Sequence, residues 1–382
     1  MKKTYFKTFA CNGFKVLRYM AVLLIVFQIS AGHTSAKTNP MAIERVIAFK
    51  RAAQLNNGIS ISWLEQTWNN NALKARPVNA SDFVLLKKLG FKSIRLPVAF
   101  EYYYTQKIAL SKVFTQVDWV LNQCKMQGLK LIIDYHYGKI DDNNYILATN
   151  TAVSLWKQIS LHYLKEDPNQ LMYEIYNEPP PMNPQLWKDA AYNICIAIRQ
   201  IDKSKTLLIG ASNYNSIYEL SRFVRLADEN IIYSFHFYEP FIFTHQGAEW
   251  VGNQVATTGV PFPYDGKKIP QLNFKAKGTW GETNYYKYNK DGNAQALFDK
   301  LSIVNNWAQK YNVPIICSEY GVYNKYADPD SRCNYIKTMR TTLKSLKIPG
   351  ILWDYNTNFS IFAGKPSIAS LPLCMHEALL NK

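Results

Sequence analysis

The sequence predicts an α/β fold, a single (β/α)8 barrel of the TIM type with a long connection after the sixth strand. Three observations predict it: eight short apolar runs, amphipathic segments between most of them, and continuous hydrophobicity within each run. Continuous β-branched runs are typical of parallel strands that are covered on both faces. The 382 residues are 48% hydrophobic and 19% charged, which is a globular composition, and α/β barrels often reach this length as one domain.

The apolar runs are the predicted strands, at residues 58–62, 92–98, 129–135, 171–176, 206–211, 231–237, 313–318 and 350–353. Helices are expected at 81–89, 113–127, 151–164, 184–201, 294–311, 332–346 and 375–380. The first of these opens with Ser81-Asp82 as its cap and closes at Gly90, and the second ends at Gly128. Residues 40–56 are expected to form a preceding helix that covers the bottom of the barrel.

The connection from 238 to 292 is abnormally long and contains no clean helix of domain size. Connections of this length are usually functional or disordered, but this one is too rich in aromatic residues for disorder. The aromatic residues are Phe241, Phe243, Trp250, Phe262, Tyr264, Phe274, Trp280, Tyr285, Tyr286 and Tyr288. Because the connection follows the sixth strand, it should lie on the C-terminal face of the barrel as a wall or lid. A packing excursion that buries its own aromatic residues is the alternative, and both can hold.

The first 36 residues have the order of a secretory signal peptide. Residues 1–19 carry five basic side chains and no acidic one, residues 20–31 are apolar, and small residues follow through Ala36. This order predicts export with cleavage after Ala31 or Ala36, which leaves 37–382 as the barrel domain. An uncleaved membrane anchor is the alternative, but the apolar stretch is shorter than the ~20 residues of a spanning helix. We therefore expect a secreted protein, extracellular or periplasmic, with no membrane contact after signal removal.

The chain is basic, with a formal net charge of +16, of which the predicted signal contributes five charges. A basic surface can favour nucleic acid, anionic membranes or acidic polymers. The lysines and arginines are scattered, however, without a run of five or six and without a recognisable nucleic-acid-binding motif. We therefore expect no nucleic-acid partner, and we expect a monomer.

Five of the six cysteines lie outside the predicted signal, at positions 124, 195, 317, 333 and 374. An odd number allows at most two disulfides and leaves one thiol free. The absence of a Cys-x-x-Cys pair argues against a zinc or redox site. Cys195 and Cys317 lie in apolar runs, where they are expected to pack as small hydrophobic residues.

Six of the predicted strands carry polar or aromatic side chains at or near the ends that share one rim of the barrel. They are Arg95, His136, Asn177, Glu178, His236, Tyr238, Glu319 and Trp353. Polar groups at the ends of apolar strands are costly unless they meet partners, and barrel active sites lie at the C-terminal strand ends. Six strands that all place such groups on one rim therefore predict a site there.

Two of these residues are carboxylates in similar settings. Glu178 lies in Tyr-Glu-Ile-Tyr-Asn-Glu-Pro-Pro at 173–180, and Glu319 lies in Val-Pro-Ile-Ile-Cys-Ser-Glu-Tyr-Gly at 313–321. Each ends an apolar run at a chain-breaking residue, as in a buried strand that delivers one acid to the rim of a sheet. Two such acids on one rim are the pair of catalytic groups that most glycosidases use to cleave a glycosidic bond.

These residues, in this order on these strands, carry a resemblance to glycoside hydrolase family 5, the cellulase and mannanase family of clan A. The sequence resembles the family from about residue 44 to its end. The resemblance implies that Glu178 is the acid/base, that Glu319 is the nucleophile, and that the other six rim residues bind substrate or support the pair. Many relatives carry two adjacent histidines where this chain has His136 and Tyr137, which leaves the role of that pair open.

The chemistry of two carboxylates agrees with those roles. A nucleophile must be ionised, and Arg95 and the hydroxyl of Tyr238 can supply a cation and a hydrogen bond to Glu319. The acid/base must start protonated, so the pKa of Glu178 should be raised by burial or by a nearby negative charge. It should fall again when the glycosyl-enzyme removes the charge of Glu319. A retaining enzyme holds the two carboxyl groups about 5–5.5 Å apart.

The supporting residues have chemical roles of their own. Asn177 can hydrogen-bond a sugar 2-hydroxyl, His236 can orient a carboxylate or Tyr238, and Trp353 offers an apolar platform to a pyranose. A structural ion pair is the alternative for Arg95, and a rim histidine without sugar contact is the alternative for His136.

Other polar and aromatic residues near the rim are expected to be structural or secondary. Glu174 shares strand parity with Glu178 but lies deeper, as a hydrogen-bonded group of the barrel interior. Asp354 and Glu239 are rim acids that assist indirectly if they assist at all. Trp63 and Trp68 follow the first strand and line a distal sugar subsite or simply pack.

A metal hydrolase on the same fold is the rival enzyme class. It would need a His-x-His pair or more histidines at strand ends, and the chain has six histidines without such a pair, so we expect no metal and no cofactor. Nucleotide-binding glycine motifs are also missing from the sequence, as is a Gly-x-Ser-x-Gly elbow, although a dispersed Ser-His-Asp triad leaves no such signature.

We therefore predict a secreted, retaining endo-β-glycanase whose partner is a β-linked polysaccharide or oligosaccharide, most simply the β-1,4-glucan of cellulose. β-Mannan and mixed-linkage glucan are the nearest alternative substrates. A non-catalytic polysaccharide-binding barrel is the alternative from another class, although such barrels normally lose a carboxylate. Transglycosylation through the same intermediate is a third possibility, which the aromatic connection would favour by restricting water.

Overall fold

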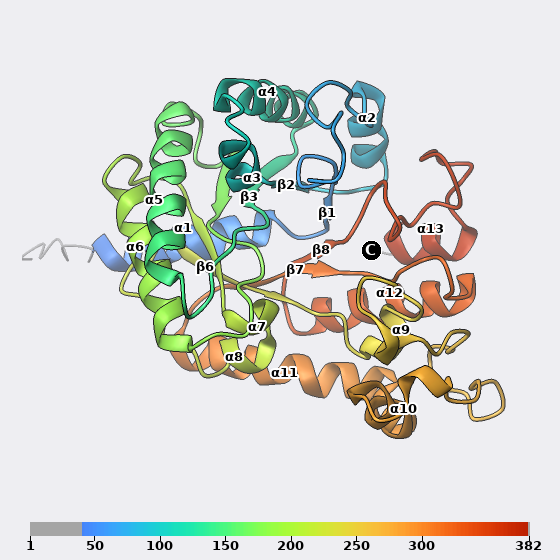
Figure 1. Ribbon diagram of the computed structural model, residues 1–382. Helices are drawn as coiled ribbons and strands as arrows, with labels where there is room; N and C mark the ends of the chain where they lie inside the picture. The colour runs from blue at the N-terminus through green and yellow to red at the C-terminus, as the bar shows by residue number, and fades with distance from the viewer. Residues whose placement is uncertain (1–39, 381–382) are drawn as a thin grey trace, which may run out of the picture. The chain divides into compact units, whose positions relative to one another are not determined.

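The computed structural model describes residues 40–380, and the predicted signal at 1–36 lies outside them. Eight parallel strands pair in chain order, and β1 pairs with β8 to close a barrel (Figure 1). The strands are β1 (Gly58–Ser60), β2 (Ser93–Val98), β3 (Lys130–Tyr135), β4 (Leu171–Glu174), β5 (Leu207–Gly210), β6 (Ile231–His236), β7 (Ile315–Tyr320) and β8 (Gly350–Leu352). Each lies within two residues of its predicted bounds, so the predicted (β/α)8 barrel is confirmed.

The helices between the strands include all those predicted. They are α1 (Pro40–Gln54), α2 (Ala80–Lys88), α3 (Phe100–Thr105), α4 (Leu110–Gln127), α5 (Tyr145–His162), α6 (Pro184–Arg199), α7 (Ser212–Asn215), α8 (Ile217–Leu220), α9 (Phe241–Thr244), α10 (Trp280–Asp291), α11 (Ala294–Tyr311), α12 (Pro329–Ser345) and α13 (Leu373–Leu380). Gly128 ends α4 in the left-handed conformation, with a φ of 61°. The predicted cap of α2 is wrong by two residues, because Asn79 accepts from the backbone of Ser81 and Asp82 completes the capping box.

Helix α1 covers the bottom of the barrel, as predicted. Its Ala52 and the following Leu55 pack on interior residues of six strands in one apolar cluster. Arg51 donates to the hydroxyl of Thr206, just before β5, at 2.8 Å. The N-terminal end of the barrel is thus closed by apolar contacts and an arginine, which leaves the opposite rim for chemistry.

The barrel interior changes from apolar to polar along the strands. The lowest layer contains Ile132, Met172, Leu208, Ile232, Ile316 and Ile351. Two positions further along three of these strands lie Asp134, Glu174 and Ser234, all fully buried. Since side chains alternate along a strand, these polar residues face the same interior, directly beneath the C-terminal rim.

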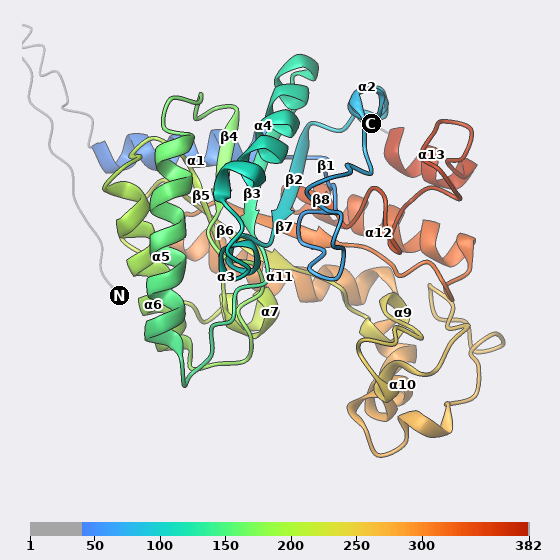
Figure 2. The ribbon, with the colours of Figure 1, turned by 45° about the horizontal axis from the view of Figure 1, so that its top comes forward.

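The segment 238–292 contains more structure than the sequence predicted. It holds α9, two short 3-10 turns (Asn253–Val255 and Phe274–Ala276) and the 12-residue helix α10, so the expectation that it lacks a helix of ordinary length is wrong. Figures 1 and 2 show α9 and α10 side by side next to the barrel. The segment also buries part of its aromatic content, including Phe243, Phe262 and Tyr288.

The described cysteines are free, and the helices are those of a globular domain. None of the five cysteines among residues 40–380 is in a disulfide, and Cys195 and Cys317 are buried in the core as expected. Within the same residues, no helix combines the length and the apolar character needed to cross a bilayer.

Candidate active site

The C-terminal rim brings Glu178 and Glu319 together. Single oxygen atoms of the two carboxylates and a ring nitrogen of His236 all lie within 4.8 Å of one another. Glu178 follows β4 and Glu319 belongs to β7, so the fold joins two acids that are far apart in the sequence. The geometric condition for a two-carboxylate site is therefore met.

A register shift in β7 aims Glu319 into the barrel. Ile316 and Ser318 face the interior, so strict alternation would turn Glu319 outward. Instead, the pairing of β6 with β7 jumps from Phe235 opposite Cys317 to His236 opposite Glu319. The irregularity inserts one residue and places Glu319 beside Ser318 on the inner side, as β-bulges near active sites commonly do.

Glu319 is held by a cation and a hydroxyl. Arg95 Nη1 lies 2.6 Å from Glu319 Oε1, and the hydroxyl of Tyr238 donates to Oε2 at 2.9 Å. Burial raises the pKa of Glu319, and the nearby His236 and Arg95 oppose that rise. Because both donors bind the ionised form, they favour the charge that a nucleophile needs.

Arg95 links the whole floor of the site and is fully buried. Its Nε lies 2.6 Å from Glu174, and its Nη2 lies 2.8 Å from the amide oxygen of Asn177 and 3.0 Å from Asp134. Both oxygens of Glu174 are thereby used, since Ser234 and Ser318 contact the other one at 3.3 Å. Glu174 is thus the hydrogen-bonded interior group that was expected.

The backbone of Glu178 is in a strained conformation. Its φ is 43°, in the left-handed region that residues other than glycine rarely adopt. Next to it, Asn177 extends the strand ladder by donating its backbone N–H to Tyr135 at 2.9 Å. Burial raises the pKa of Glu178, while His136 and Arg95 act in the opposite direction. About a third of the side chain remains exposed, so the carboxyl group can reach a substrate.

The two carboxylates differ in their partners, and this difference separates their proton affinities. His236 Nδ1 lies 2.7 Å from Glu178 and 3.4 Å from Glu319, whereas Arg95 contacts Glu319 directly. Burial lowers the pKa of His236 to about 4, so the ring is neutral near pH 7. The direct guanidinium contact favours the charged form of Glu319 more than that of Glu178, so Glu178 is the acid of the pair that holds a proton more readily.

His136 and Trp353 form the other side of the rim. Their rings stack in parallel, with centroids 5.8 Å apart. His136 Nδ1 lies 2.6 Å from Asp134, and its Nε2 lies 3.4 Å from the amide nitrogen of Asn177. The arrangement makes Nδ1 the protonated nitrogen and turns Nε2 towards Asn177, which fixes that amide between His136 and Arg95.

All eight predicted rim residues are thus gathered in one place, but two important neighbours were missed. Asp134 orients His136, and strand parity with His136 could have identified it. The amide nitrogen of Asn215 lies 3.2 Å from His236 Nε2, and this residue follows β5 in a loop that carries no recognisable motif. With Nε2 as the acceptor, His236 donates from Nδ1 to Glu178.

The other residues considered near the rim are either buried or at the surface. Trp63 is completely buried, so of the two alternatives for this residue the structure supports packing and not a sugar subsite. Trp68 is exposed and lies beside Tyr137, with ring centroids 6.4 Å apart. Asp354 is buried and accepts from the backbone of Thr357 at 3.1 Å, while Glu239 pairs with Lys300.

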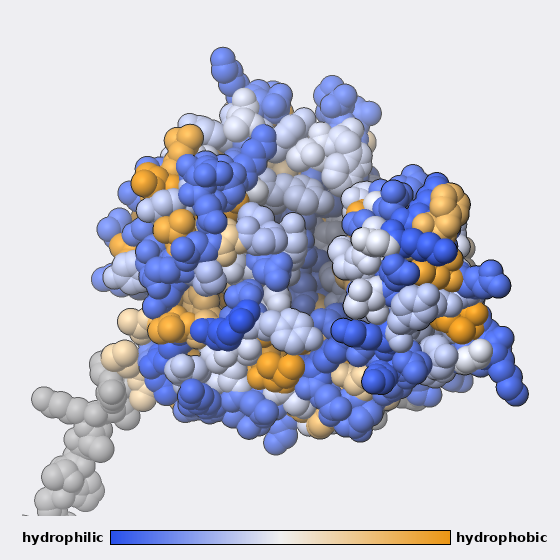
Figure 3. Space-filling view, turned by 60° about the horizontal axis from the view of Figure 1, so that its bottom comes forward, coloured by the Kyte–Doolittle hydropathy of each residue, from blue (hydrophilic) through white to orange (hydrophobic). Residues whose placement is uncertain are grey.

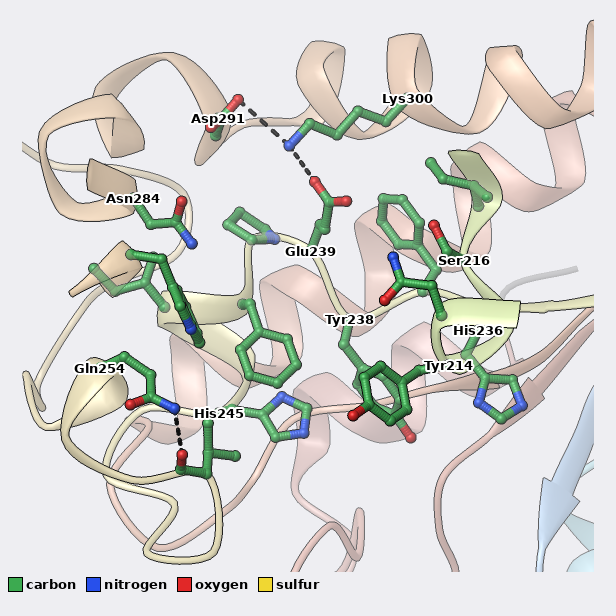
Figure 4. A pocket seen from close by; sticks show the side chains of 18 of the residues that line it. Tyr214, Ser216, His236, Tyr238, Glu239, His245, Gln254, Asn284, Asp291 and Lys300 are labelled. Carbon is green, nitrogen blue, oxygen red and sulfur yellow. Dashed lines mark hydrogen bonds and ion pairs between the residues drawn. The ribbon is translucent and has the colours of Figure 1, made fainter. Parts of the chain in front are cut away.

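A cleft of about 840 Å³ opens beside the carboxylates. Figure 3 shows this face of the molecule deeply hollowed, and Figure 4 shows the side chains that line the cleft. Glu178 and His236 line it, and the segment 238–292 supplies Trp250, Trp280 and Asn284. The segment therefore forms a wall of the site, as predicted, in addition to burying some of its own aromatic residues.

Glu178, His236 and Glu319 could in principle ligate a cation. Arg95 already places a positive charge 2.6 Å from Glu319, and a metal ion bound there would be repelled by it. The donor set is better explained by two acids with different proton affinities.

Comparison with known proteins agrees with this geometry. Residues 36–359 match the model of the cellulase family, glycosyl hydrolase family 5. The chain belongs to glycosyl hydrolase family 5. Its relatives include endoglucanase 3 of Fibrobacter succinogenes, 31% identical over 87% of this chain, although the match spans only 53% of that protein. Endoglucanase C of Acetivibrio thermocellus is 28% identical over 75% of this chain and 86% of its own length.

Solved structures of this glycoside hydrolase family have the same fold. Endoglucanase Cel5A of Thermotoga maritima superposes with a TM-score of 0.72 at 24% identity, over 87% of this chain and 99% of that chain. The same protein has been solved with cellobiose and with mannotriose. At this level of identity the likeness supports the barrel and not a substrate.

Proposed function

We propose that this family 5 protein is a retaining endo-β-1,4-glucanase. The observation that carries the proposal is the convergence of Glu178 and Glu319, with oxygens within 4.8 Å of one another. Retaining glycosidases hold their carboxyl groups about 5–5.5 Å apart, whereas inverting enzymes need about 6.5–9.5 Å to admit a water molecule. The short spacing supports direct attack by one carboxylate.

In the first step, Glu319 attacks the anomeric carbon while Glu178 gives its proton to the departing glycosidic oxygen. The C–O bond to the leaving sugar breaks as the bond to Glu319 forms. Loss of the negative charge on Glu319 then makes Glu178 a stronger acid, so it stays ionised and removes a proton from the incoming water. Water oxygen bonds to the anomeric carbon and Glu319 leaves with its charge restored.

The substrate assignment rests on the relatives. Most of those found are named endoglucanases, and one is named cellodextrinase A. The match spans only about half of the first relative, so the assignment of cellulose-type β-1,4-glucan to this chain is part of the proposal. We also propose that the protein is exported through its first 36 residues and acts as a monomer.

The test is hydrolysis of soluble carboxymethyl-cellulose, β-mannan and β-1,3-glucan by the mature protein, with product sizing and NMR of the first-formed anomer. We expect internal cleavage of the β-1,4-glucan and a β-anomer product. Glu178→Gln and Glu319→Gln should each lose about 10⁴-fold or more of kcat while circular dichroism stays unchanged. An α-anomer would contradict the retaining mechanism, and activity in both variants would contradict the assigned roles.

A further inference from the structure

Two of the five described cysteines contact each other at the end of the chain. Cys333 lies near the start of α12, Cys374 lies in the first turn of α13, and their side chains share a hydrogen bond. Helices α12 and α13 pack side by side on the outside of the barrel (Figures 1 and 2). The two thiols therefore meet across a helix–helix contact, although the chain between them passes through the whole of β8.

The other three described cysteines are isolated from one another. Cys124, Cys195 and Cys317 are buried on α4, α6 and β7, respectively. Burial raises the pKa of each of these thiols, and a neighbouring cysteine contributes to none of the three shifts. Cys317 instead donates to the backbone carbonyl of Glu319 at 3.3 Å. Within residues 40–380, the contact between α12 and α13 is thus the one place where two thiols meet.

The two thiols of this contact differ in their access to solvent. Cys333 is 3% exposed and belongs to the main apolar cluster, whereas Cys374 is partly exposed and packs at the edge of that cluster. The guanidinium of Arg332 lies near both sulfur atoms, and its buried Nε has no hydrogen-bond partner among the described residues. A neighbouring cation favours the thiolate, which is the reactive form of a cysteine. The outer thiol can thus meet a reagent from solvent while the inner thiol is held directly behind it.

We infer that Cys333 and Cys374 are a redox-active pair that closes into a disulfide between α12 and α13, with a low-molecular-weight or protein disulfide as the oxidant. The thiolate of Cys374 attacks one sulfur of the oxidant, which forms a mixed disulfide and releases the other sulfur as a thiol. The thiolate of Cys333 then attacks the sulfur of Cys374 and releases the second thiol of the oxidant. The pair loses two electrons and two protons, and the oxidant takes up both.

The disulfide would fix the last helix of the barrel at its first turn. In the reduced protein, α13 is held by the packing of Met375 and Leu379 in the core and by Arg340, which donates to the carbonyls of Ala378 and Leu379 at 2.8 Å and 3.1 Å. These contacts hold the second half of α13, whereas Cys374 lies in its first half. The bond also closes a covalent loop around β8, and such loops stabilise a fold by restricting the unfolded chain. A disulfide persists outside the cytoplasm, where the proposed export would take the protein.

The test treats the full chain with oxidised glutathione or with dithiothreitol, blocks the remaining thiols by alkylation, and maps the tryptic peptides by mass spectrometry. We expect the oxidised sample to contain the peptide of Cys333 joined to the peptide of Cys374. We expect the oxidised protein to melt on the order of 5 °C above the reduced protein, and dithiothreitol to reverse the difference. Neither measurement uses hydrolysis, so the result is independent of the proposed function.

Single replacements identify the pair. Cys333→Ala and Cys374→Ala should each melt at the same temperature in both conditions, whereas Cys195→Ala, the matched control on α6, should keep the difference. Cys374 is partly exposed, so Cys374→Ala preserves the test if Cys333→Ala does not fold. Alkylation of both cysteines after oxidation, glutathione retained on Cys374 beside a free Cys333, or equal melting temperatures of the oxidised and reduced wild type would each overturn the inference.

Discussion

The centre and the wall of this site are built in opposite ways. The centre consists of residues at strand ends, most of them buried. They are connected through one arginine whose four partners come from three strands and the loop after β4. The wall consists of loop and helix residues whose aromatic rings are half exposed and whose ionic contacts are few. The comparison teaches that the barrel positions the two acids, while much of the cleft wall is built by structures added to the barrel.

The largest effect on stability and on the pH–kcat profile is expected when Arg95 is replaced. Arg95→Met leaves Glu174, Asp134 and Glu319 in a buried site without their cation, and breaking a buried ion pair in this way costs about 3–5 kcal/mol. The pKa of Glu319 should rise further, so the acidic limb of the pH–kcat profile should move to higher pH. Urea denaturation and the pH profile measure the two effects.

Arg45→Met is the matched control for Arg95→Met. Arg45 also contacts a carboxylate twice, Glu229 at 2.7 Å. Its own side chain is 27% exposed, Glu229 keeps Arg225 as a second partner at 3.0 Å, and Glu229 precedes β6, away from the rim. We expect about 1 kcal/mol of destabilisation or less and an unchanged pH profile. If Arg95→Met were as stable as Arg45→Met with the same acidic limb, the centre would not depend on the arginine network.

The same contrast explains what could be predicted from the sequence. The strands and most helices were predictable because hydrophobic runs and caps are local signals. The ends of those runs located the rim, and the resemblance to the family singled out the eight residues on it. The bulge that turns Glu319 inward was not predictable, because it depends on pairing with β6 and β8. The left-handed backbone at Asn213, Tyr214 and Asn215 was not predicted for a similar reason. It depends on hydrogen bonds to Pro179 and Pro180, and two asparagines are only a weak signal for such backbone.

Replacing the buried Glu65 should change the pH dependence of stability and leave activity unchanged. Glu65, in the loop after β1, is buried, and its Oε2 has no hydrogen-bond partner among the described residues. Burial raises its pKa to about 8, from an ordinary value of 4.5. The unfolded chain releases the proton at lower pH than the folded protein does, so stability falls as the pH rises from about 4.5 to about 8 and levels off above it.

Glu65→Gln removes this titration. We expect the variant to gain stability relative to the wild type as pH increases, by on the order of 3 kcal/mol between pH 5 and pH 8. Melting curves of both proteins at pH 5, 6.5 and 8 measure the widening gap. Glu249→Gln, at an exposed side chain of the wall, is the control and should show a constant gap over this range. A gap that stays constant for Glu65→Gln would mean that this carboxyl group titrates normally in the folded protein.

The smallest effect is expected at the ion pair of the wall. Lys300 contacts Glu239 and Asp291, whose side chains are about a third exposed, so solvent screens both pairs and Lys300→Met should cost about 1 kcal/mol. Because these contacts connect α10 to the rim, the loss should appear mainly as a few-fold higher KM for long oligosaccharides, with kcat nearly unchanged. Steady-state kinetics on cellopentaose separates the two parameters. A large fall in kcat would mean that the wall acts on the carboxylates themselves, and the division between a catalytic centre and a cleft wall would no longer describe this site.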